Sequence, residues 1–254
     1  MKMKKLLKTI VLTLVISLGL ILESCTTDPG LASISLEMKA TTSLSTINAG
    51  GRVMNTGLEF TDVIIGVAEL EFETLEENDA EDSGDGIEDN DGDGEDDNEE
   101  IEFEGEFTVD LITGVSTPDF GETTIAPGLY EEMEMELEPF LEGGLSMFVA
   151  FNYTPDGATE AVRYEYSNDQ ELEFEIENEA GFFLDESTLN QMLILIDLDA
   201  MFTGIDLNSA TADVDGIVRI NGTSNTDLAT LIAQNLDSIM EGGEDDDDDG
   251  EFDD

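Results

Sequence analysis

The chain has 254 residues, with 63 acidic residues against 8 Lys and Arg, no His, no Trp and one Cys, giving a formal charge of −55 at pH 7. Nucleic-acid binding requires a basic surface, while catalytic triads and tetrahedral zinc sites require His or several Cys, so these classes are excluded. A bound metal would have to be a hard cation that prefers oxygen ligands. Because 40% of the residues are hydrophobic, we still expect a folded core.

The N-terminal segment has the features of a secretory signal. An uncharged apolar run over residues 9–22 follows four lysines, at positions 2, 4, 5 and 8. The run is shorter than the roughly 20 residues that a helix needs to cross a bilayer, but it suits a signal peptide. It ends shortly before Cys25, the only cysteine of the chain.

The sequence around this cysteine, Leu22-Glu23-Ser24-Cys25, resembles a bacterial lipobox, although Glu23 replaces the usual small or apolar residue. The resemblance implies that residues 1–24 are removed and that Cys25 carries fatty acyl chains such as palmitate. Two or more acyl chains make a stable anchor. Thr26, rather than Asp, follows the cysteine, which by similarity to the enterobacterial sorting rule favours the outer membrane. We therefore expect a lipid-anchored protein of the cell envelope, in either leaflet; the alternative is an ordinary secretory peptide.

Residues 25–30 form the expected tether, and residues 31–223 are expected to form one β domain. Two segments, 132–138 and 171–177, alternate glutamate with apolar residues, which is typical of half-buried strands. Their inward residues are predicted to be Met133, Met135, Leu137, Leu172, Phe174 and Ile176. Further strands are predicted at 32–40, 61–73, 101–111, 145–153, 161–166, 191–198 and 218–220. Many short strands separated by turn signals favour an antiparallel β-sandwich.

The C-terminal part of the chain is expected to contain one helix and a tail. Residues 224–240 begin with cap-like polar residues and place apolar side chains at helical spacing, which predicts an amphipathic helix. Residues 241–254 are almost entirely acidic residues and glycine. Strong self-repulsion and low hydrophobicity predict a disordered, solvated tail there.

Three segments resemble a transthyretin-like, or prealbumin-like, domain of unknown function found in bacterial, Bacteroidetes-like lipoproteins. Residues 60–73 (FTDVIIGVAELEFE) resemble its second-strand motif, and residues 107–137 resemble its "DL…G…LGE…LPAGxY" run. Residues 193–201 (LILIDLDAM) resemble the strand and short helix that follow. The resemblance covers residues 31–205. It implies a prealbumin-like sandwich tethered to the envelope, akin to adhesin and fimbrial modules, without an active site.

Residues 76–100 form an acidic insertion that contains a candidate calcium loop. The pattern D-x-D-x-D-G starts at Asp89 and places the turn glycine at Gly94. Asp96 stands where an EF-hand has an apolar residue, and no amphipathic helices flank the segment, so it looks more like extracellular aspartate–glycine calcium repeats. The alternative is a solvated, low-complexity insertion. The candidate ligands are Asp89, Asp91, Asp93, Glu95 (through its carbonyl), Asp97 and Glu100.

Other acidic and aromatic residues are weaker candidates. Asp197 with Asp199, and Asp213 with Asp215, could each ligate a cation, but solvent exposure explains the first pair and turn chemistry the second. Tyr164 and Tyr166 share a strand face, where we expect core packing. Glycosidases use a pair of carboxylates, but among 63 acidic residues such a pair would occur by chance. We therefore expect no enzyme.

Together, these features favour an envelope-anchored, non-catalytic β-sandwich lipoprotein with a structural or adhesion-type role and a weak calcium-binding loop. The alternative is a ligand-binding or carrier lipoprotein whose partner is a cationic or glycan molecule. The membrane is the expected partner through the lipid anchor, and nucleic acid is not expected to bind.

Overall fold

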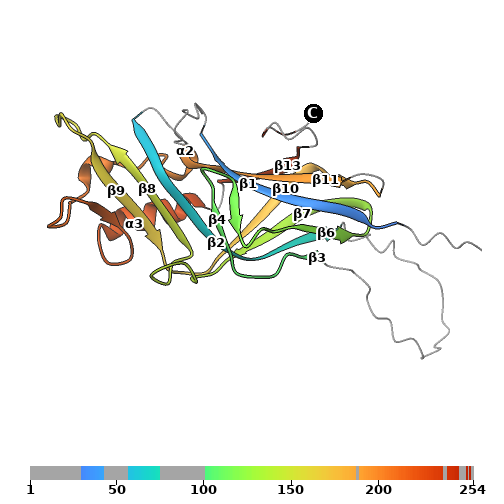
Figure 1. The fold of residues 1–254 in the computed structure, drawn as a ribbon. Helices are drawn as coiled ribbons and strands as arrows, with labels where there is room; N and C mark the ends of the chain where they lie inside the picture. The colour runs from blue at the N-terminus through green and yellow to red at the C-terminus, as the bar shows by residue number, and fades with distance from the viewer. Residues whose placement is uncertain are drawn as a thin grey trace, which may run out of the picture. The chain divides into compact units, whose positions relative to one another are not determined.

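The computed structural model describes residues 30–42, 57–74, 101–186, 189–236, 239–245, 250 and 252, and this part of the chain is mostly β (Figure 1). The smaller sheet contains β1 (Ala32–Thr41), β6 (Glu122–Ile125), β11 (Leu189–Asp197) and β13 (Met240–Glu244). The larger sheet contains β2 (Leu58–Thr74), β3 (Ile101–Glu102), β4 (Phe107–Asp110), β5 (Val115–Thr117), β7 (Gly128–Leu137), β8 (Met147–Tyr153), β9 (Val162–Asn168), β10 (Leu172–Leu184) and β12 (Val218–Ile220). The helical elements are α2 (Leu198–Met201), the 3-10 turn η1 (Leu207–Ser209) and α3 (Thr226–Asn235).

The smaller sheet has the order β13-β11-β1-β6, so the first strand of the domain lies in its interior. β1 and β11 run parallel, with Ser33 opposite Leu189 and Thr41 opposite Asp197. β6 and β13 join the sheet antiparallel to β1 and β11, respectively.

The larger sheet is organised around the long strand β2, which pairs with two groups of strands. Its first half, Leu58 to Ile65, pairs with β8, and its second half, Val67 to Thr74, pairs with β7. Gly66 lies at the division, where its N–H donates to the Ser146 carbonyl and its carbonyl accepts from the Glu138 N–H. A Cβ atom at this position would lie 3.0 Å from the Glu138 carbonyl oxygen, so glycine lets the two groups meet here.

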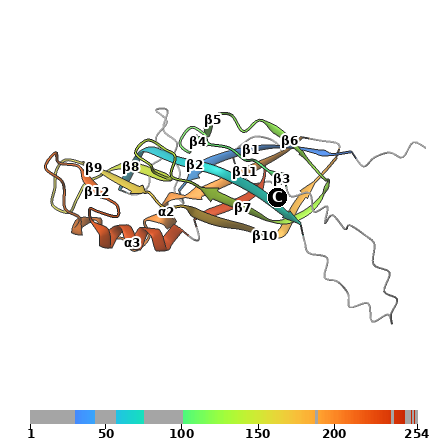
Figure 2. The same ribbon diagram turned by 90° about the horizontal axis from the view of Figure 1, so that it is seen from below.

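We name these groups the β7–β10 arm (β7, β10 and the second half of β2) and the β8–β12 arm (β8, β9, β12 and the first half of β2). The smaller sheet packs over the β7–β10 arm: Gly242 of β13 lies directly against Met133, Ile176 and Phe182, where no side chain would fit. α3 lies beside β12 in the other arm (Figure 2). Both arms contribute to one hydrophobic core within the unit Leu31–Asp254.

The alternation predicted for the two glutamate-rich strands is confirmed. Met133, Met135 and Leu137 are fully buried, and Phe174 and Ile176 are at most 5% exposed, while Leu172 is half-buried at the edge of the core. Tyr164 and Tyr166 pack in the core, as expected. The predicted strand over 101–111 is divided into β3 and β4, and β5 and β6 are additional strands.

Two features of the strand pairing differ from the predicted antiparallel arrangement. β1 pairs in parallel with β11, and β12 pairs in parallel with β9, so both sheets are mixed. Alternation of apolar residues identifies a strand but not the direction of its partner, which long-range packing decides.

The prediction of a disordered tail over residues 241–254 is wrong for its first part. Residues 241–244 belong to β13, and Asp245 is buried, with its N–H donating to the Gln191 carbonyl. Acidic composition disfavours burial of side chains, but the main chain of Gly242 and Gly243 pairs with β11. Main-chain hydrogen bonds and the absence of side chains at these glycines therefore fix this segment, despite its charge.

The predicted C-terminal helix corresponds to α3, which ends at Asn235 rather than at residue 240. Its buried residues include Leu228 and Ile232. Asn225 precedes the helix in a left-handed conformation, and its amide donates to the carbonyls of Thr211 and Arg219 instead of capping the helix. A second, shorter helix, α2, follows β11.

Candidate functional site

The outer surface of the β7–β10 arm is covered by glutamates. Strand alternation turns Met133 and Met135 into the core, so the intervening residues of β7 face outward. The register aligns glutamates of neighbouring strands: Glu134 lies opposite Glu71 and Glu175, and Glu136 lies opposite Glu69 and Glu173. We define the glutamate face as Glu69, Glu71, Glu73, Glu132, Glu134, Glu136, Glu173 and Glu175.

Like charges placed directly across a sheet repel, and this repulsion changes the ionisation of the glutamate face. The pKa of Glu134 is raised from 4.5 to about 7, first because its carboxyl hydrogen-bonds Glu173, and then through partial burial and repulsion by neighbouring carboxylates. The pKa of Glu136 is also raised, first by burial and then by repulsion from Glu171 and Glu138. With a pKa of about 7, the Glu134 carboxyl group is therefore partly protonated near neutral pH.

Two groups of carboxylates here could hold a metal ion. One consists of Glu71, Glu73 and Glu134, and the other of Glu136, Glu138 and Glu171; within each group the ligand oxygens lie within 4.8 Å of one another. Calcium takes six to eight oxygen ligands, so three carboxylates would leave several positions for water. This donor set fits a weakly bound, hard divalent cation.

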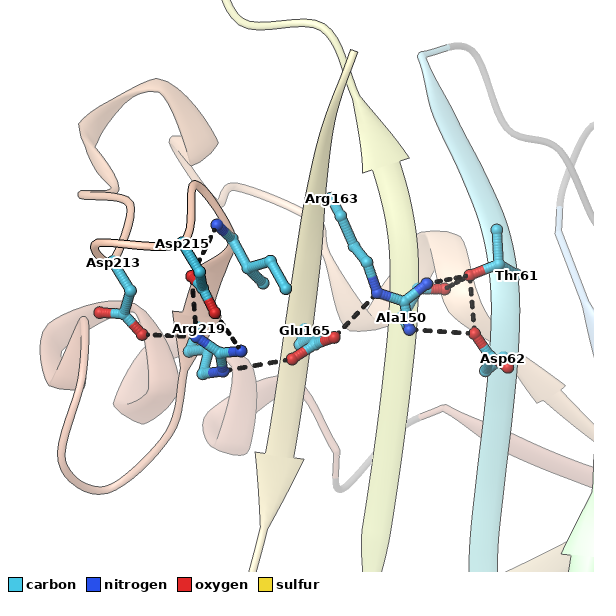
Figure 3. Close-up of polar contacts among 9 residues, drawn as sticks. Thr61, Asp62, Ala150, Arg163, Glu165, Asp213, Asp215 and Arg219 are labelled. Carbon is cyan, nitrogen blue, oxygen red and sulfur yellow. Dashed lines mark hydrogen bonds and ion pairs between the residues drawn. The ribbon is translucent and has the colours of Figure 1, made fainter.

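The outer surface of the β8–β12 arm has a different arrangement, in which Glu165 on β9 joins two arginines (Figure 3). The Arg163 Nε donates to Glu165 at 2.8 Å, and the Arg219 Nε lies 3.4 Å from the other Glu165 oxygen. Arg163 also reaches Asp62 and Thr61 on β2, at 3.2 and 3.3 Å. These contacts connect β2, β9 and β12 across the sheet.

The network ends at the turn before β12. Arg219 donates to Asp213 at 2.9 Å and to both oxygens of Asp215 at 2.9 and 3.2 Å. The Ile217 N–H also donates to Asp215. The pKa of Asp215 is lowered first by Arg219 and then by this N–H, while the pKa of Arg219 is raised by Asp215 and Asp213. We name Asp62, Arg163, Glu165, Arg219, Asp213 and Asp215 the arginine network.

Open cavities formed by the described residues include two that lie elsewhere on the domain. A groove of about 700 Å³ is lined mainly by apolar residues, among them Phe140, Leu141 and Phe148. A smaller cavity of about 390 Å³ lies near Tyr153, Phe202 and Asn208. Glu134 and Glu136, whose pKa values are raised, line neither cavity.

The two aspartate pairs considered from the sequence have structural roles. Asp197 caps α2 by accepting from the N–H groups of Asp199 and Ala200, and Asp199 lies in the first turn of this helix. Asp213 and Asp215 form the turn that binds Arg219. The structure therefore assigns capping and turn stabilisation to these residues.

The predicted lipid-anchor residue, Cys25, and the predicted calcium ligands lie outside the described residues. These ligands are Asp89, Asp91, Asp93, Glu95, Asp97 and Glu100. The grouping of glutamates on three strands was not predicted, although the alternation of two of these strands was visible in the sequence. Its signal was the repetition of the same glutamate alternation in 69–73, 132–138 and 171–177.

Within the ranges that the structure describes, no helix has the length and apolar character needed to cross a bilayer. No known protein family, curated protein or solved structure matches this chain.

Proposed function

We propose that the protein is a lipid-anchored, non-catalytic module of the cell envelope, with a structural or adhesion-type role at the outer membrane. The observation that carries this proposal is the position of the only cysteine: Cys25 ends a lipobox-like sequence and stands six residues before Leu31, where the folded unit begins. An acylated cysteine at this place would attach the whole β domain to the membrane through a short tether. The proposal gives this domain the role of an anchored, strongly anionic surface.

The fold that we propose in more detail is a β-sandwich of the prealbumin-like type. Its support is the packing of the smaller sheet over the β7–β10 arm and the sharing of one core by both sheets. The short helix α2 after β11 also agrees with the family resemblance of residues 193–201. The parallel pairs β1–β11 and β9–β12 are the features in which this chain differs from a purely antiparallel sandwich.

Acylation of Cys25 tests the proposal directly. The full chain, produced in a bacterial host and fed an alkyne-labelled palmitate, should carry the label on the mature N-terminal peptide. The Cys25→Ser variant should lose the label, whereas the control Ser43→Ala should keep it. A mass spectrum that shows an intact leader or an unmodified sulfur would contradict the proposal.

We further propose that calcium binds weakly to the acidic insertion, with Asp91 and Asp93 among its ligands. Oxygen-rich donor sets of this type, as in extracellular modules, bind calcium with dissociation constants of about 10⁻⁴–10⁻³ M. Isothermal titration of the full chain should give smaller heats for the double variant Asp91→Asn/Asp93→Asn than for wild type. Equal heats would show that these aspartates are not ligands and would direct attention to the glutamate face.

The second candidate function is a carrier for a cationic or glycan ligand. The observation that favours a cationic ligand is the glutamate face, where neighbouring carboxylates already retain a proton near pH 7. Spermine serves as a probe: its binding should weaken in Glu134→Gln/Glu173→Gln but not in Glu186→Gln, whose side chain lies in an exposed turn. Equal affinity in all three proteins would reject the glutamate face as a cation-binding surface.

A further inference from the structure

Four large apolar residues at one end of the β domain have exposed side chains. Leu31, Leu129, Phe183 and Leu189 are between 40% and 61% exposed, although large apolar residues are otherwise mostly buried in this domain. An exposed cluster of such residues marks an interaction surface more often than a scattered single residue does. We name these four residues the apolar end.

Strand pairing brings the four residues to the same end, although they are distant in the sequence. Leu129 lies opposite Phe183 at the start of β7 and the end of β10. Leu31 directly precedes Ala32, whose partner is Ile125, and Leu189 is the partner of Ser33. The β6–β7 connection joins Ile125 to Gly128, so both pairs lie at this end of the domain. Because they alternate with buried residues, Leu31 and Leu189 flank the end on the outer side of the smaller sheet, and Leu129 and Phe183 flank it on the outer side of the larger sheet. Both ribbon views place the start of β1 and the start of β11 at this end (Figures 1 and 2).

At this end, Asn190 on β11 is hydrogen-bonded to β1 and to Asp185, which follows β10. Asn190 donates through its amide to the carbonyls of Ser33 and Asp185 and accepts from the Asp185 N–H. Three elements are therefore tied together by one buried side chain. This fixes Leu189 relative to β1 and gives the apolar end a defined shape before any partner binds.

The short segment between Cys25 and the domain indicates the lipid bilayer as the partner of the apolar end. Six peptide units separate Cys25 from Leu31, and a fully extended chain of this length spans only about 20 Å. If acyl chains on Cys25 are inserted in a bilayer, Leu31, which begins the domain at this end, cannot lie farther than this from the lipid headgroups. The domain would thus meet the membrane with the end that exposes apolar side chains.

The charge of this end selects the type of lipid contact. The described basic residues are Lys39, Arg163 and Arg219, and none of them lies at the apolar end. Asp185 and Glu186 follow Phe183, so the rim of this surface is acidic. Attraction to anionic headgroups is therefore not the source of binding, and apolar insertion into the interface of a zwitterionic bilayer fits better.

We propose that the apolar end rests on the membrane in which Cys25 is anchored, with Leu129 and Phe183 inserted into the lipid interface. This inference rests on the proposed acylation of Cys25. It adds an orientation: the β8–β12 arm and the arginine network point away from the lipid, and the domain stands on the membrane instead of swinging freely on its tether.

Tryptophan fluorescence tests the contact, because the natural chain contains no Trp. The full acylated protein carrying Phe183→Trp or Leu129→Trp is reconstituted in phosphatidylcholine vesicles that contain lipids brominated at different depths of the acyl chain. Val214→Trp is the matched control, since Val214 is fully exposed and lies shortly before β12, the strand that Figure 2 shows at the opposite end of the domain. Mass spectrometry of the same samples records acylation.

The proposal expects a blue-shifted emission and several-fold stronger quenching by brominated lipid for Phe183→Trp and Leu129→Trp than for Val214→Trp, with little change between low and high salt. An acylated protein in which all three variants are quenched equally weakly would overturn the membrane contact while leaving the anchor intact. A blue shift without quenching would also overturn it, since a second copy or another part of the chain would then cover this end. A sample without acyl chains on Cys25 would overturn the proposed function and this inference together.

Discussion

The two arms of the larger sheet share strand β2 but differ in how the negative charge on their outer surfaces is compensated. On the β7–β10 arm, carboxylates of β2, β7 and β10 face one another, and the pKa of Glu134 rises. On the β8–β12 arm, Glu165 lies between Arg163 and Arg219, and the pKa of Asp215 falls. Two of the three described basic residues thus serve one arm. The difference indicates that the arginines stabilise one surface, while the other depends on protons, salt or cations from solution.

The largest effect is expected from breaking the arginine network. Arg163→Met keeps the apolar stem but removes the hydrogen bonds to Glu165, Asp62 and Thr61, and should lower the free energy of unfolding by about 2 kcal/mol. Urea denaturation measures this loss. Lys39→Met, which removes the ion pair with Glu37, is the control and should cost less than about 1 kcal/mol. Equal losses would mean that the network is no stronger than an ordinary surface pair.

The next effect concerns pH, and it should have opposite signs in the two arms. Glu134 binds its proton more tightly in the folded state, with a pKa of about 7 against 4.5, so stability should fall as pH rises from 4.5 to 7. Because this side chain is only half-buried, the expected change is roughly 1–2 kcal/mol. Asp215, whose pKa is lowered, should instead lose its contribution as pH falls below its ordinary value of 3.8.

Urea denaturation between pH 4.5 and 8 tests this prediction on the glutamate face. Glu134→Gln should flatten the pH dependence, whereas Glu122→Gln, at an exposed position on the edge strand β6, should leave it unchanged. Persistence of the full pH dependence in Glu134→Gln would show that another group carries it.

A somewhat smaller effect is expected from calcium. With a dissociation constant of about 10⁻³ M, calcium at about ten times that concentration should stabilise the fold by about 1.4 kcal/mol. Thermal unfolding of wild type in calcium and in sodium chloride of equal ionic strength separates binding from screening. The double variant Glu134→Gln/Glu136→Gln should lose the part of the stabilisation that calcium gives beyond sodium chloride, because each carboxylate group of this surface then lacks one ligand. If neither calcium nor sodium chloride changes the midpoint temperature of unfolding, the glutamate face does not depend on cations from solution.

The smallest effect is expected when a cation is placed within the glutamate face. Glu175→Lys would bring an ammonium group opposite Glu134 and should stabilise the domain by about 0.5 kcal/mol, the size of a favourable cross-strand pair. Glu186→Lys changes the net charge equally at an exposed turn and serves as the control. Equal stabilisation by both variants would mean that total charge, and not the cross-strand register, limits stability.

The sequence predicted the strands of both arms well, because alternation reports which residues of a strand are buried. It could not predict that Glu134 lies between Glu71 and Glu175, since register depends on pairing between distant segments. The arginine network was also not predictable: Arg163 and Arg219 reach the same Glu165 only because β12 adds in parallel to β9. Strand β13 was missed because its acidic composition hides main-chain pairing with β11.

The placement of β1 also has a consequence for the order in which the chain can fold. Its neighbour β11 lies more than 150 residues later, since Asn190 donates to the Ser33 carbonyl across 157 positions. During synthesis from the N-terminus, β1 therefore emerges early, and most of the polypeptide must follow before its partner β11 is available. Such distant closure slows folding. The same topology that builds the smaller sheet thus delays completion of the native state until synthesis is nearly finished.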